Sequence, residues 1–285
     1  MQTVLDCRGQ LLDLSRPRIM GILNVTPDSF SDGGRYNTLD KAVRHAVEMV
    51  EEGADIVDVG GESTRPGAQT VTVQEEIDRV VPVIEALRRE LDVIVSLDTS
   101  EAEVMRAGAA VGAGIINDVR ALTRDGALQV AAGLDLPVIL MHSLREQPAA
   151  GFVPQYDDVV AEVKACLAER VTAAIDAGIK KEQIVLDPGF GGGMFGKTPS
   201  QDLTMIQRFS EFLDMGMPVL AGLSRKSFIG AILDRPVSER LPGSLAVATL
   251  VLNAGACILR VHDVAESVDV LNMVMALKAL NEKTA

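Results

Sequence analysis

Hydrophobic and polar positions along the chain follow two alternating periods. Short runs rich in β-branched residues are each followed by a Gly- or Asp-rich loop and then by a stretch with apolar residues at helical spacing. The runs predict eight strands, at Arg18–Leu23, Asp55–Val59, Val93–Leu97, Gly114–Asn117, Leu136–Met141, Gln183–Leu186, Met217–Gly222 and Ala256–Val261. The helical stretches include Leu39–Glu52, Val73–Glu90, Glu101–Ala107, Gly126–Ala132, Tyr156–Ala177, Ser200–Leu213, Arg240–Asn253 and Val264–Ala279. Glycines follow several of them where a helix would stop, at Gly53, Gly108, Gly133, Gly178 and Gly255.

Strands that alternate with helices predict a parallel sheet with helical crossovers. The chain has 285 residues, which suits a (β/α)8 TIM barrel of roughly 250 residues. No linker or change of composition divides it, so we expect one domain over residues 1–285. A doubly wound open sheet is the alternative, but the first strand is not followed by the GxGxxG typical of such folds.

Composition and charge exclude several classes of protein. Hydrophobic residues make up 47% of the chain and charged residues 24%, as in globular proteins. The net charge of -13 argues against a broad surface for nucleic acid. No apolar run approaches the roughly 20 residues that cross a bilayer, and Asp6 and Arg8 interrupt any secretory leader. Three distant cysteines without a CxxC spacing indicate reduced thiols, so we expect a cytoplasmic protein.

Polar side chains follow every predicted strand. They include Asn24 after the first strand, Asp98 after the third and Asp187 after the sixth. Any one of them could simply cap the next helix, since Asp, Asn and Ser accept bonds from the first backbone N–H groups. In a barrel, however, all eight loops meet at the carboxyl ends of the strands, where active sites lie. The repeated pattern therefore favours an active site at that end.

These polar residues divide into two chemical groups. Asp98, Asn117 and Asp187 offer carboxylate and amide groups suited to the donor-rich edge of a flat heterocycle. The other group consists of cationic donors suited to a phosphate or diphosphate, namely Lys226, Arg260 and His262. For His262 the alternative is a neutral, hydrogen-bonded histidine without a ligand.

Other kinds of catalytic chemistry find no support in the sequence. We find no Ser-His-Asp arrangement, HExxH or GxxxxGK[ST] motif, so neither covalent catalysis nor thiolate ligation of a metal is indicated. A metal would be a hard cation held by oxygen and substrate phosphates, which favours Mg²⁺.

Seven motifs in register carry a family resemblance. They are NVTPDSFSDGG, DVGGESTRPGA, SLDTS, NDV, LDPGFG, GLSRKSFIG and RVHDV. From Arg18 to Leu280 the chain resembles the dihydropteroate synthase family. The resemblance implies condensation of 6-hydroxymethyl-7,8-dihydropterin diphosphate with 4-aminobenzoate, which gives dihydropteroate and pyrophosphate for folate biosynthesis. It also implies an SN1-like mechanism, in which diphosphate leaves before the aniline nitrogen attacks.

The resemblance assigns roles to residues of this chain. Pterin binding would fall to Asp98, Asn117, Met141, Asp187, Phe190 and Lys226. The aminobenzoate subsite would contain Phe190, Phe195 and Ser227. Arg260 and His262 would bind the diphosphate, with Asn24 acting through Mg²⁺. Loop closure over the substrates would involve Phe30, Asp32, Ser63, Thr64, Arg65 and Pro66.

The chain departs from the family pattern in two places. Gly192-Gly193-Met194 stands between DPGFG and the following FGK, and Ser143–Pro148 replaces the usual continuation after Met141-His142. The insertion could be neutral drift in a surface loop. Alternatively, a Gly-Gly hinge lets Met194 or Phe195 enter the aminobenzoate subsite and clash with sulfonamides, which extend beyond the substrate.

Two rival functions and the oligomeric state stay open. A pterin-binding methyltransferase would share the barrel but has no use for a diphosphate site. A non-catalytic pterin-binding paralogue would retain Asn117 and Asp187 without turnover. The resemblance implies a homodimer, and the mostly apolar stretch Val264–Leu280 could form its interface. Packing at the edge of the barrel explains the same apolar face.

Overall fold

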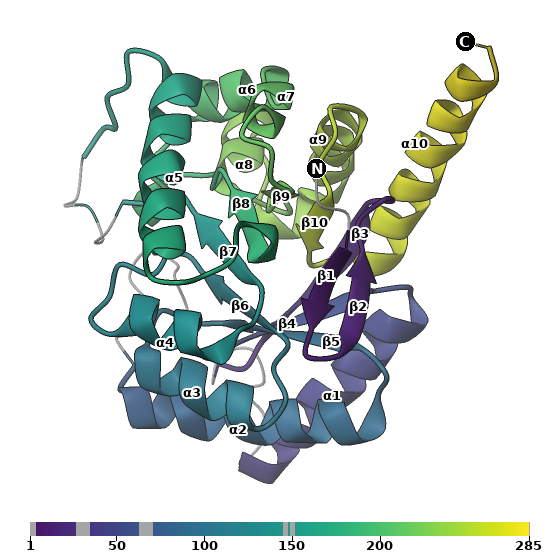
Figure 1. Ribbon diagram of the computed structural model, residues 1–285. Helices are drawn as coiled ribbons and strands as arrows, with labels where there is room; N and C mark the ends of the chain where they lie inside the picture. The colour runs from purple at the N-terminus through teal and green to yellow at the C-terminus, as the bar shows by residue number, and fades with distance from the viewer. Residues whose placement is uncertain (1–3, 27–34, 63–70, 145–147, 149–151, 285) are drawn as a thin grey trace.

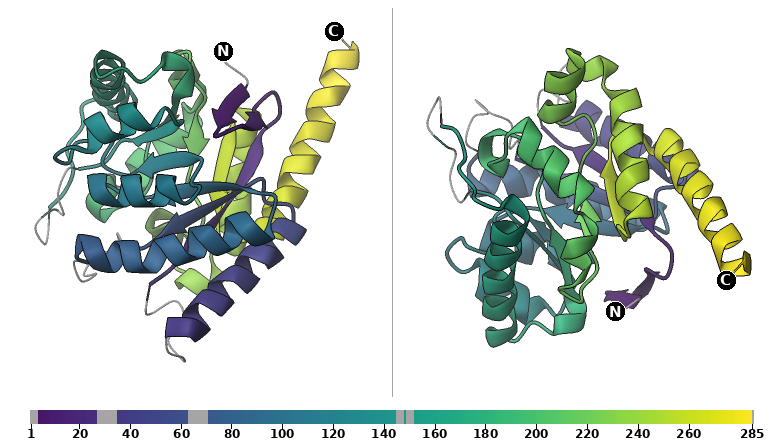
Figure 2. Two further views of the ribbon diagram at one scale, coloured as in Figure 1. Left: turned by 60° about the horizontal axis from the view of Figure 1, so that its bottom comes forward. Right: turned by 90° about the horizontal axis from the view of Figure 1, so that it is seen from above.

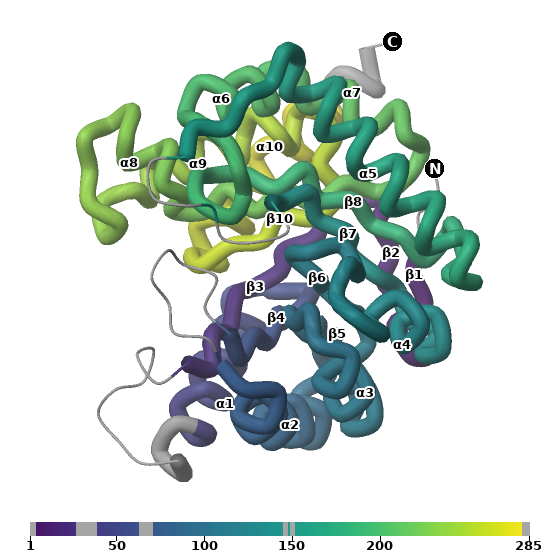
Figure 3. Tube along the Cα trace, turned by 90° about the vertical axis from the view of Figure 1, so that its left-hand side faces the viewer, coloured from purple at the N-terminus to yellow at the C-terminus, as the bar shows by residue number. Residues whose placement is uncertain are grey.

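The described part of the chain forms a parallel sheet that closes on itself (Figures 1 and 3). This computed structural model describes residues 4–26, 35–62, 71–144, 148 and 152–284. The parallel strands are β3 (Arg18–Asn24), β4 (Ile56–Gly60), β5 (Ile94–Asp98), β6 (Ile115–Asp118), β7 (Val138–Met141), β8 (Ile184–Asp187), β9 (Leu220–Ala221) and β10 (Ile258–Val261). Their order is β8-β7-β6-β5-β4-β3-β10-β9, and a parallel bridge between Leu186 and Val219 closes the ring. The predicted (β/α)8 TIM barrel is confirmed.

Helices surround the barrel, as Figures 1 and 2 show. The α-helices are α1 (Arg35–Glu51), α2 (Val73–Glu90), α3 (Ala102–Ala110), α4 (Ala127–Leu134), α5 (Val159–Asp176), α6 (Pro199–Gln207), α7 (Ser210–Leu213), α8 (Ser227–Leu233), α9 (Leu241–Asn253) and α10 (Val264–Thr284). Short 3-10 turns lie at η2 (Lys181–Gln183), η3 (Gly193–Phe195) and η4 (Val237–Glu239). None of the helices in the described ranges is long and apolar enough to cross a membrane.

Local signals set several helix ends. Thr72 and Glu75 form a capping box at the start of α2, and Thr198 caps α6 just before Pro199. Gly53, Gly178 and Gly255 follow α1, α5 and α9 with positive φ, as expected of helix stops.

Two of the predicted glycine stops are wrong. Gly108 lies within α3 and Gly133 within α4. At Gly108 the reason is close packing, because a Cβ there would lie 2.4 Å from Cδ2 of Leu97 on β5. Helix α3 can therefore approach the barrel wall at this point.

An antiparallel hairpin that the hydrophobic pattern did not predict closes one end of the barrel (Figure 3). Its strands are β1 (Val4–Cys7) and β2 (Gln10–Asp13), joined by Arg8 and Gly9 with φ of 62° and 84°. The hairpin packs on a layer with one buried apolar residue from each barrel strand, which are Met20, Ile56, Ile94, Ile115, Ile139, Val185, Leu220 and Ile258. This end is the amino-terminal end of the strands, so the opposite end is the one left for a site.

The helices after β8 and β9 also differ from the sequence prediction. The stretch predicted as one helix over Ser200–Leu213 is divided into α6 and α7. Helix α8, which begins at Ser227 directly after the β9 loop, was not predicted. It has only seven residues, too few for a helical period to stand out.

Candidate active site

The carboxyl ends of the strands bring polar groups of distant segments together. Asn24 ends β3, Asp98 ends β5 and Asp187 ends β8. Glycines keep the space between them open. A Cβ on Gly60 would lie 3.5 Å from Cβ of Asp98 and 3.9 Å from Oδ1 of Asn24, while one on Gly222 would lie 3.8 Å from Oδ2 of Asp187. We call this end of the barrel the mouth.

A buried network crosses the mouth from β4 to β10. Asp58 accepts hydrogen bonds at Oδ2 from Nε of Arg260, at 2.6 Å, and from Nδ2 of Asn117, at 3.1 Å. The same guanidinium donates through Nη2 to Oδ2 of Asp98, at 2.5 Å. Asp58 has a fully buried side chain, whereas those of Arg260 and Asp98 are 18% and 17% exposed. Asp58 is therefore placed to orient its neighbours rather than to touch a ligand.

Burial changes the acidity of the carboxyl groups in the mouth. It raises the pKa of Asp98 to about 7, against the opposing charge of Arg260 and with a further increase from Asp58. Burial also raises the pKa of Asp187, while a hydrogen bond from the Gly189 N–H and the charge of Lys226 oppose it. Perturbed carboxyl groups in a polar mouth are typical of a functional site.

A lysine and a histidine come from the loop after β9 and from the residue after β10. Burial, followed by the charge of Arg260, lowers the pKa of Lys226 to about 8, and its Nζ lies 3.5 Å from the centre of the Phe195 ring. His262 shares a 3.1 Å hydrogen bond between its Nδ1 and Oγ of Ser224. Burial lowers the pKa of His262 to about 4, so its ring is neutral at pH 7.

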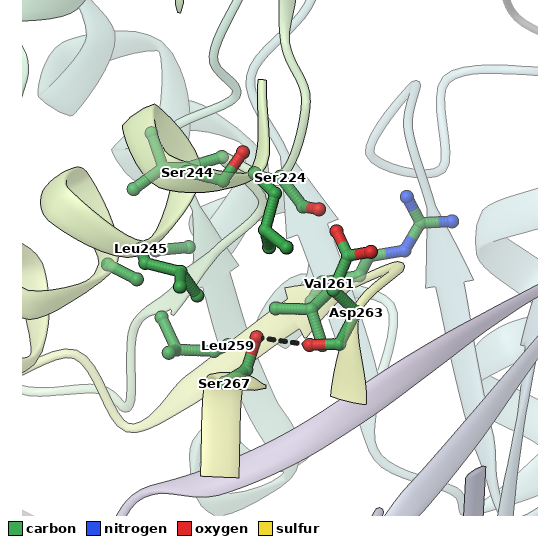
Figure 4. Close-up of a pocket in the computed structure, with 12 residues that line it drawn as sticks. Ser224, Ser244, Leu245, Leu259, Val261, Asp263 and Ser267 are labelled. Atoms are coloured by element: carbon green, nitrogen blue, oxygen red, sulfur yellow. Dashed lines mark hydrogen bonds between the residues drawn. The ribbon is translucent and has the colours of Figure 1, made fainter. Parts of the chain in front are cut away.

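Ion pairing joins these two loops below the mouth. Arg225 Nε and Nη2 donate to the two carboxylate oxygens of Asp263, at 2.9 Å and 2.5 Å. Figure 4 shows Asp263 beside Ser224 in a small pocket, with Oγ of Ser267 donating to the Asp263 carbonyl oxygen at 2.6 Å. The ion pair thus restrains two neighbouring residues, Lys226, which follows Arg225, and His262, which precedes Asp263.

Comparison with known proteins identifies the family. Residues 20–262 match the model of the family described as pterin binding enzyme. Dihydropteroate synthase of Escherichia coli (strain K12) is 51% identical over 278 residues, which are 98% of both chains. A structure of Xanthomonas albilineans dihydropteroate synthase with 4-aminobenzoic acid has a TM-score of 0.91 and 50% identity over 98% of this chain and 99% of its own. Another from that organism, with 7,8-dihydropteroate, has a TM-score of 0.88 and 48% identity over 97% and 99%. The chain belongs to the dihydropteroate synthase family.

These relatives are dihydropteroate synthases, so the family predicted from the sequence is confirmed. Of the residues expected at the site, the structure brings Asp98, Asn117 and Arg260 into one network. The division into heterocycle and anion groups is less clean than the sequence suggested. Arg260, expected at the diphosphate, is bonded to Asp98, expected at the pterin.

The apolar residues expected at the site occupy two different places. Met141 is 6% exposed and packs with Val119 and the buried Met194, against which Phe195 lies. Phe190 is 1% exposed and packs into the main core between strands and helices. It offers a ligand almost no surface, so this placement favours Phe195 over Phe190 as the aromatic wall of the subsite.

The inserted segment is an ordered turn in this dihydropteroate synthase family member. Its 3-10 turn η3 is held by bonds from Gly192 N–H to Oγ of Ser227, at 3.2 Å, and from Leu144 N–H to the Met194 carbonyl, at 2.8 Å. These bonds fix Gly192 and Met194 at both ends of the proposed hinge. The residues expected to take part in loop closure lie outside the described residues. These are Phe30, Asp32, Ser63, Thr64, Arg65 and Pro66.

Sequence reasoning missed three buried groups near the mouth. Asp58 interrupts the apolar strand Ile56–Gly60, and an acidic residue at a buried strand position is a signal that could have revealed it. Lys197 is 2% exposed and Asp202 is 0% exposed. No pattern marks these two, because Lys197 follows a glycine in a loop and Asp202 lies in the first turn of α6, where acidic residues are common.

Asp118 shows the alternative outcome for a polar strand end. Its Oδ1 accepts bonds from Oγ of Ser100 and from the Arg120 N–H, and its Oδ2 accepts from the Leu122 N–H. These bonds stabilise the loop after β6 and join it to Ser100 in the loop after β5. Asp118 is therefore a structural residue, although it does not cap a helix, because α4 begins only at Ala127.

Proposed function

We propose that the protein is a dihydropteroate synthase that joins a dihydropterin diphosphate to 4-aminobenzoate and releases pyrophosphate. The observation that carries this proposal is the network of Asp58, Asn117, Asp98 and Arg260 across the mouth. It places acceptors for a heterocycle beside a cation for an anion. The proposal is supported by relatives named dihydropteroate synthase, which align with this chain over nearly their whole length.

We assign the pterin to Asp98, Asn117 and Asp187, with Met141 and Lys226 beside it. Carboxylate and amide groups accept hydrogen bonds from the amino and ring N–H groups of a pterin. The diphosphate would then lie against Arg260 and His262, whose charge and ring nitrogens would stabilise the leaving anion.

The proposed mechanism separates two charges. Diphosphate leaves first, with its electron pair, and the cation that remains on the pterin is captured by the aniline nitrogen of aminobenzoate, which then loses a proton. Arg260 and His262 would stabilise the anion, while Asp98 and Asp187 lie where negative groups stabilise the cation. The loops with Phe30, Asp32 and residues 63–66 would exclude water, which would otherwise hydrolyse the cation.

Mg²⁺ fits this site only as a partner of the substrate. The described residues contain no group of three or more His, Cys, Asp or Glu side chains that could hold a metal. Asn24 supplies one amide oxygen at the mouth, so the diphosphate and water would provide the remaining oxygen ligands that Mg²⁺ prefers. The metal would neutralise charge on the leaving diphosphate.

Pyrophosphate release tests the proposal. The protein is incubated with 6-hydroxymethyl-7,8-dihydropterin diphosphate and Mg²⁺, with and without 4-aminobenzoate. We expect release that depends on aminobenzoate, together with dihydropteroate in equal amount. No release in either case would overturn the proposal, and pterin binding without release would identify a non-catalytic paralogue. A pterin-binding methyltransferase would also release no pyrophosphate, because it has no use for a diphosphate site.

We also propose that the insertion makes the protein less sensitive to sulfonamides. Met194 of the insertion packs beside Met141, and the Phe195 that follows it contacts Lys226. Both contacts lie next to the residues assigned to the pterin and the aminobenzoate, where they would narrow the space for a ligand. A sulfonamide that extends further than the substrate would then clash.

The homodimer and the cytoplasmic location stay proposals. For the homodimer the support is an apolar surface on α10, where Met273, Leu277 and Leu280 are 65%, 59% and 61% exposed. The outer part of α10 extends beyond the barrel in both views (Figures 1 and 2).

A further inference from the structure

Lys197 is a buried lysine close to the mouth. It is 2% exposed, and no carboxylate in the described part of the chain forms an ion pair with it. Burial lowers the pKa of Lys197 to about 7, against the opposing charges of Asp202 and Asp187. A buried lysine perturbed in this way beside a site is a candidate for a functional role.

Two hydrogen bonds hold the Lys197 ammonium. Its Nζ donates to the carbonyl oxygen of Pro188, at 3.0 Å, and lies 2.7 Å from Nδ1 of His142. Burial, followed by the charge of Lys197, lowers the pKa of His142 to about 3, so the ring is neutral and its Nδ1 accepts. The lysine thus joins the end of β7 to the turn after β8.

The turn after β8 packs directly on His142. The His142 N–H donates to the Asp187 carbonyl, at 2.9 Å. Gly189 has φ of 66°, and a Cβ there would lie only 2.1 Å from the His142 carbonyl oxygen. The same turn carries the Asp187 carboxylate, whose Oδ1 accepts from the Gly189 N–H at 2.8 Å. Small movements of the turn therefore reorient that carboxylate.

A second buried ionisable group holds the other end of the turn. Asp202 accepts from the Gly191 N–H at Oδ1, at 2.9 Å, and its Oδ2 has no hydrogen-bond partner among the described residues. The Lys197 N–H donates to the Gly191 carbonyl, at 3.2 Å, which closes residues 192–196 into a loop. That loop presents Phe195 to Lys226. Lys197 is thus the anchor shared by the Asp187 turn and the inserted segment.

We propose that Lys197 is a positioning residue for the pterin half of the reaction, acting through Pro188 and His142 on the orientation of Asp187. The inference rests on the proposed function, because it assigns Asp187 to the pterin. It does not involve Arg260 or His262, which come from β10 on another part of the barrel wall. Loss of Lys197 should therefore affect the two halves of the substrate unequally.

The test compares Lys197→Met with Lys278→Met. Both substitutions remove a lysine that donates to a backbone carbonyl, and Lys278 does so to Leu252 on the outer helices, at 2.8 Å. Binding of 6-hydroxymethyl-7,8-dihydropterin and of inorganic pyrophosphate with Mg²⁺ is measured by calorimetry. We expect Lys197→Met to raise the pterin Kd and the pterin KM by about tenfold or more, and to leave the pyrophosphate Kd within about twofold. Lys278→Met should change neither.

Rescue separates positioning from a general loss of structure. Lys197→Gln keeps a donor for Pro188 and should recover part of the pterin affinity. The same measurements on Lys197→Gln and Asp202→Asn serve if Lys197→Met does not fold. Equal weakening of pterin and pyrophosphate, or an unchanged pterin Kd in a folded variant, would overturn the inference. Wild-type protein without synthase activity would instead contradict the proposed function.

Discussion

Asp58 is the residue at which the two halves of the site meet. Its Oδ2 holds both Asn117, assigned to the pterin, and Arg260, assigned to the diphosphate. Its Oδ1 has no partner, so all of its bonding in the described structure passes through one oxygen. A change at Asp58 should therefore weaken binding of both the pterin and the diphosphate, whereas a change at Lys197 should weaken binding of the pterin alone.

Asp58→Asn tests this role. The substitution removes one of the two carboxylates that pair with the largely buried Arg260, and breaking a buried ion pair commonly costs about 3–5 kcal/mol. We expect kcat/KM to fall by about 100-fold or more, with weaker binding of both dihydropterin and pyrophosphate. Asp55→Asn is the matched control, because Asp55 pairs with Nη1 of Arg18, at 2.9 Å, at the opposite end of the barrel. An Asp58→Asn enzyme as active as the control would contradict the role.

His262 gives a second prediction at the scale of a residue. Its pKa is lowered by burial, then by Arg260, to about 4, while Asp263 opposes the shift. A bound diphosphate would raise that pKa, so the complex would hold more protons than the free protein. By linkage, pyrophosphate should bind more tightly as the pH falls from about 8 to about 5.5, and the effect should level off near the free pKa.

The measurement is the pyrophosphate Kd across this range for wild type and His262→Gln. Pyrophosphate itself titrates, but it does so equally with both proteins. We expect the ratio of the variant Kd to the wild-type Kd to grow as the pH falls. A ratio independent of pH would show that His262 takes up no proton on binding.

At the scale of an element, the insertion is the clearest departure from the family. The turn η3 is tied to Leu144 and Ser227, so its effect depends on a fixed shape rather than on a mobile hinge. Met194 fills a gap beside Val119 and Met141. The turn also places Phe195 against Lys226, so it forms part of the surface around that lysine.

Deletion of residues 192–194 should restore sensitivity to sulfonamides. We expect the ratio of sulfonamide Ki to aminobenzoate KM to fall by roughly 10- to 200-fold, the range that one steric clash provides. Phe195→Ala, which leaves the insertion in place, shows whether the ring itself makes the clash. Inhibition assays against aminobenzoate give both constants. A ratio unchanged by the deletion would assign the insertion to neutral drift.

At the scale of the whole molecule, α10 and its apolar surface bear on assembly. Leu271 and Val274 of α10 are 2% and 4% exposed and pack inward, whereas Met273 and Leu277 face outward. We predict a homodimer in sedimentation at micromolar concentration. Replacing Met273 and Leu277 by Lys should give monomers, while the same change at exposed Leu11 should not. A wild-type monomer would show that barrel packing alone explains the apolar stretch.

A feature could be predicted from the sequence when the interactions that form it are local in the chain. Strands such as Ile94–Asp98 were predicted to within a residue or two, because a run of β-branched residues reports on its own burial. Helix α8 and the hairpin β1–β2 were missed, since short elements leave too few positions to show a period. Phe190 and Phe195 are both aromatic residues after the same strand, and only packing separates them.

The sequence by itself determined the barrel and the polar residues that end its strands, such as Asn24, Asp98 and Asp187. Strand and helix periods are local, and in a parallel barrel the residue that ends each strand must point to the same end. Only the tertiary structure decided which of these groups bond to one another. Asp58 and Arg260 are 202 positions apart in the chain, and no local pattern encodes a contact between them. Their contact follows from the parallel pairing of β3 with both β4 and β10, which sets Asp58 on β4 only one strand away from Arg260 on β10.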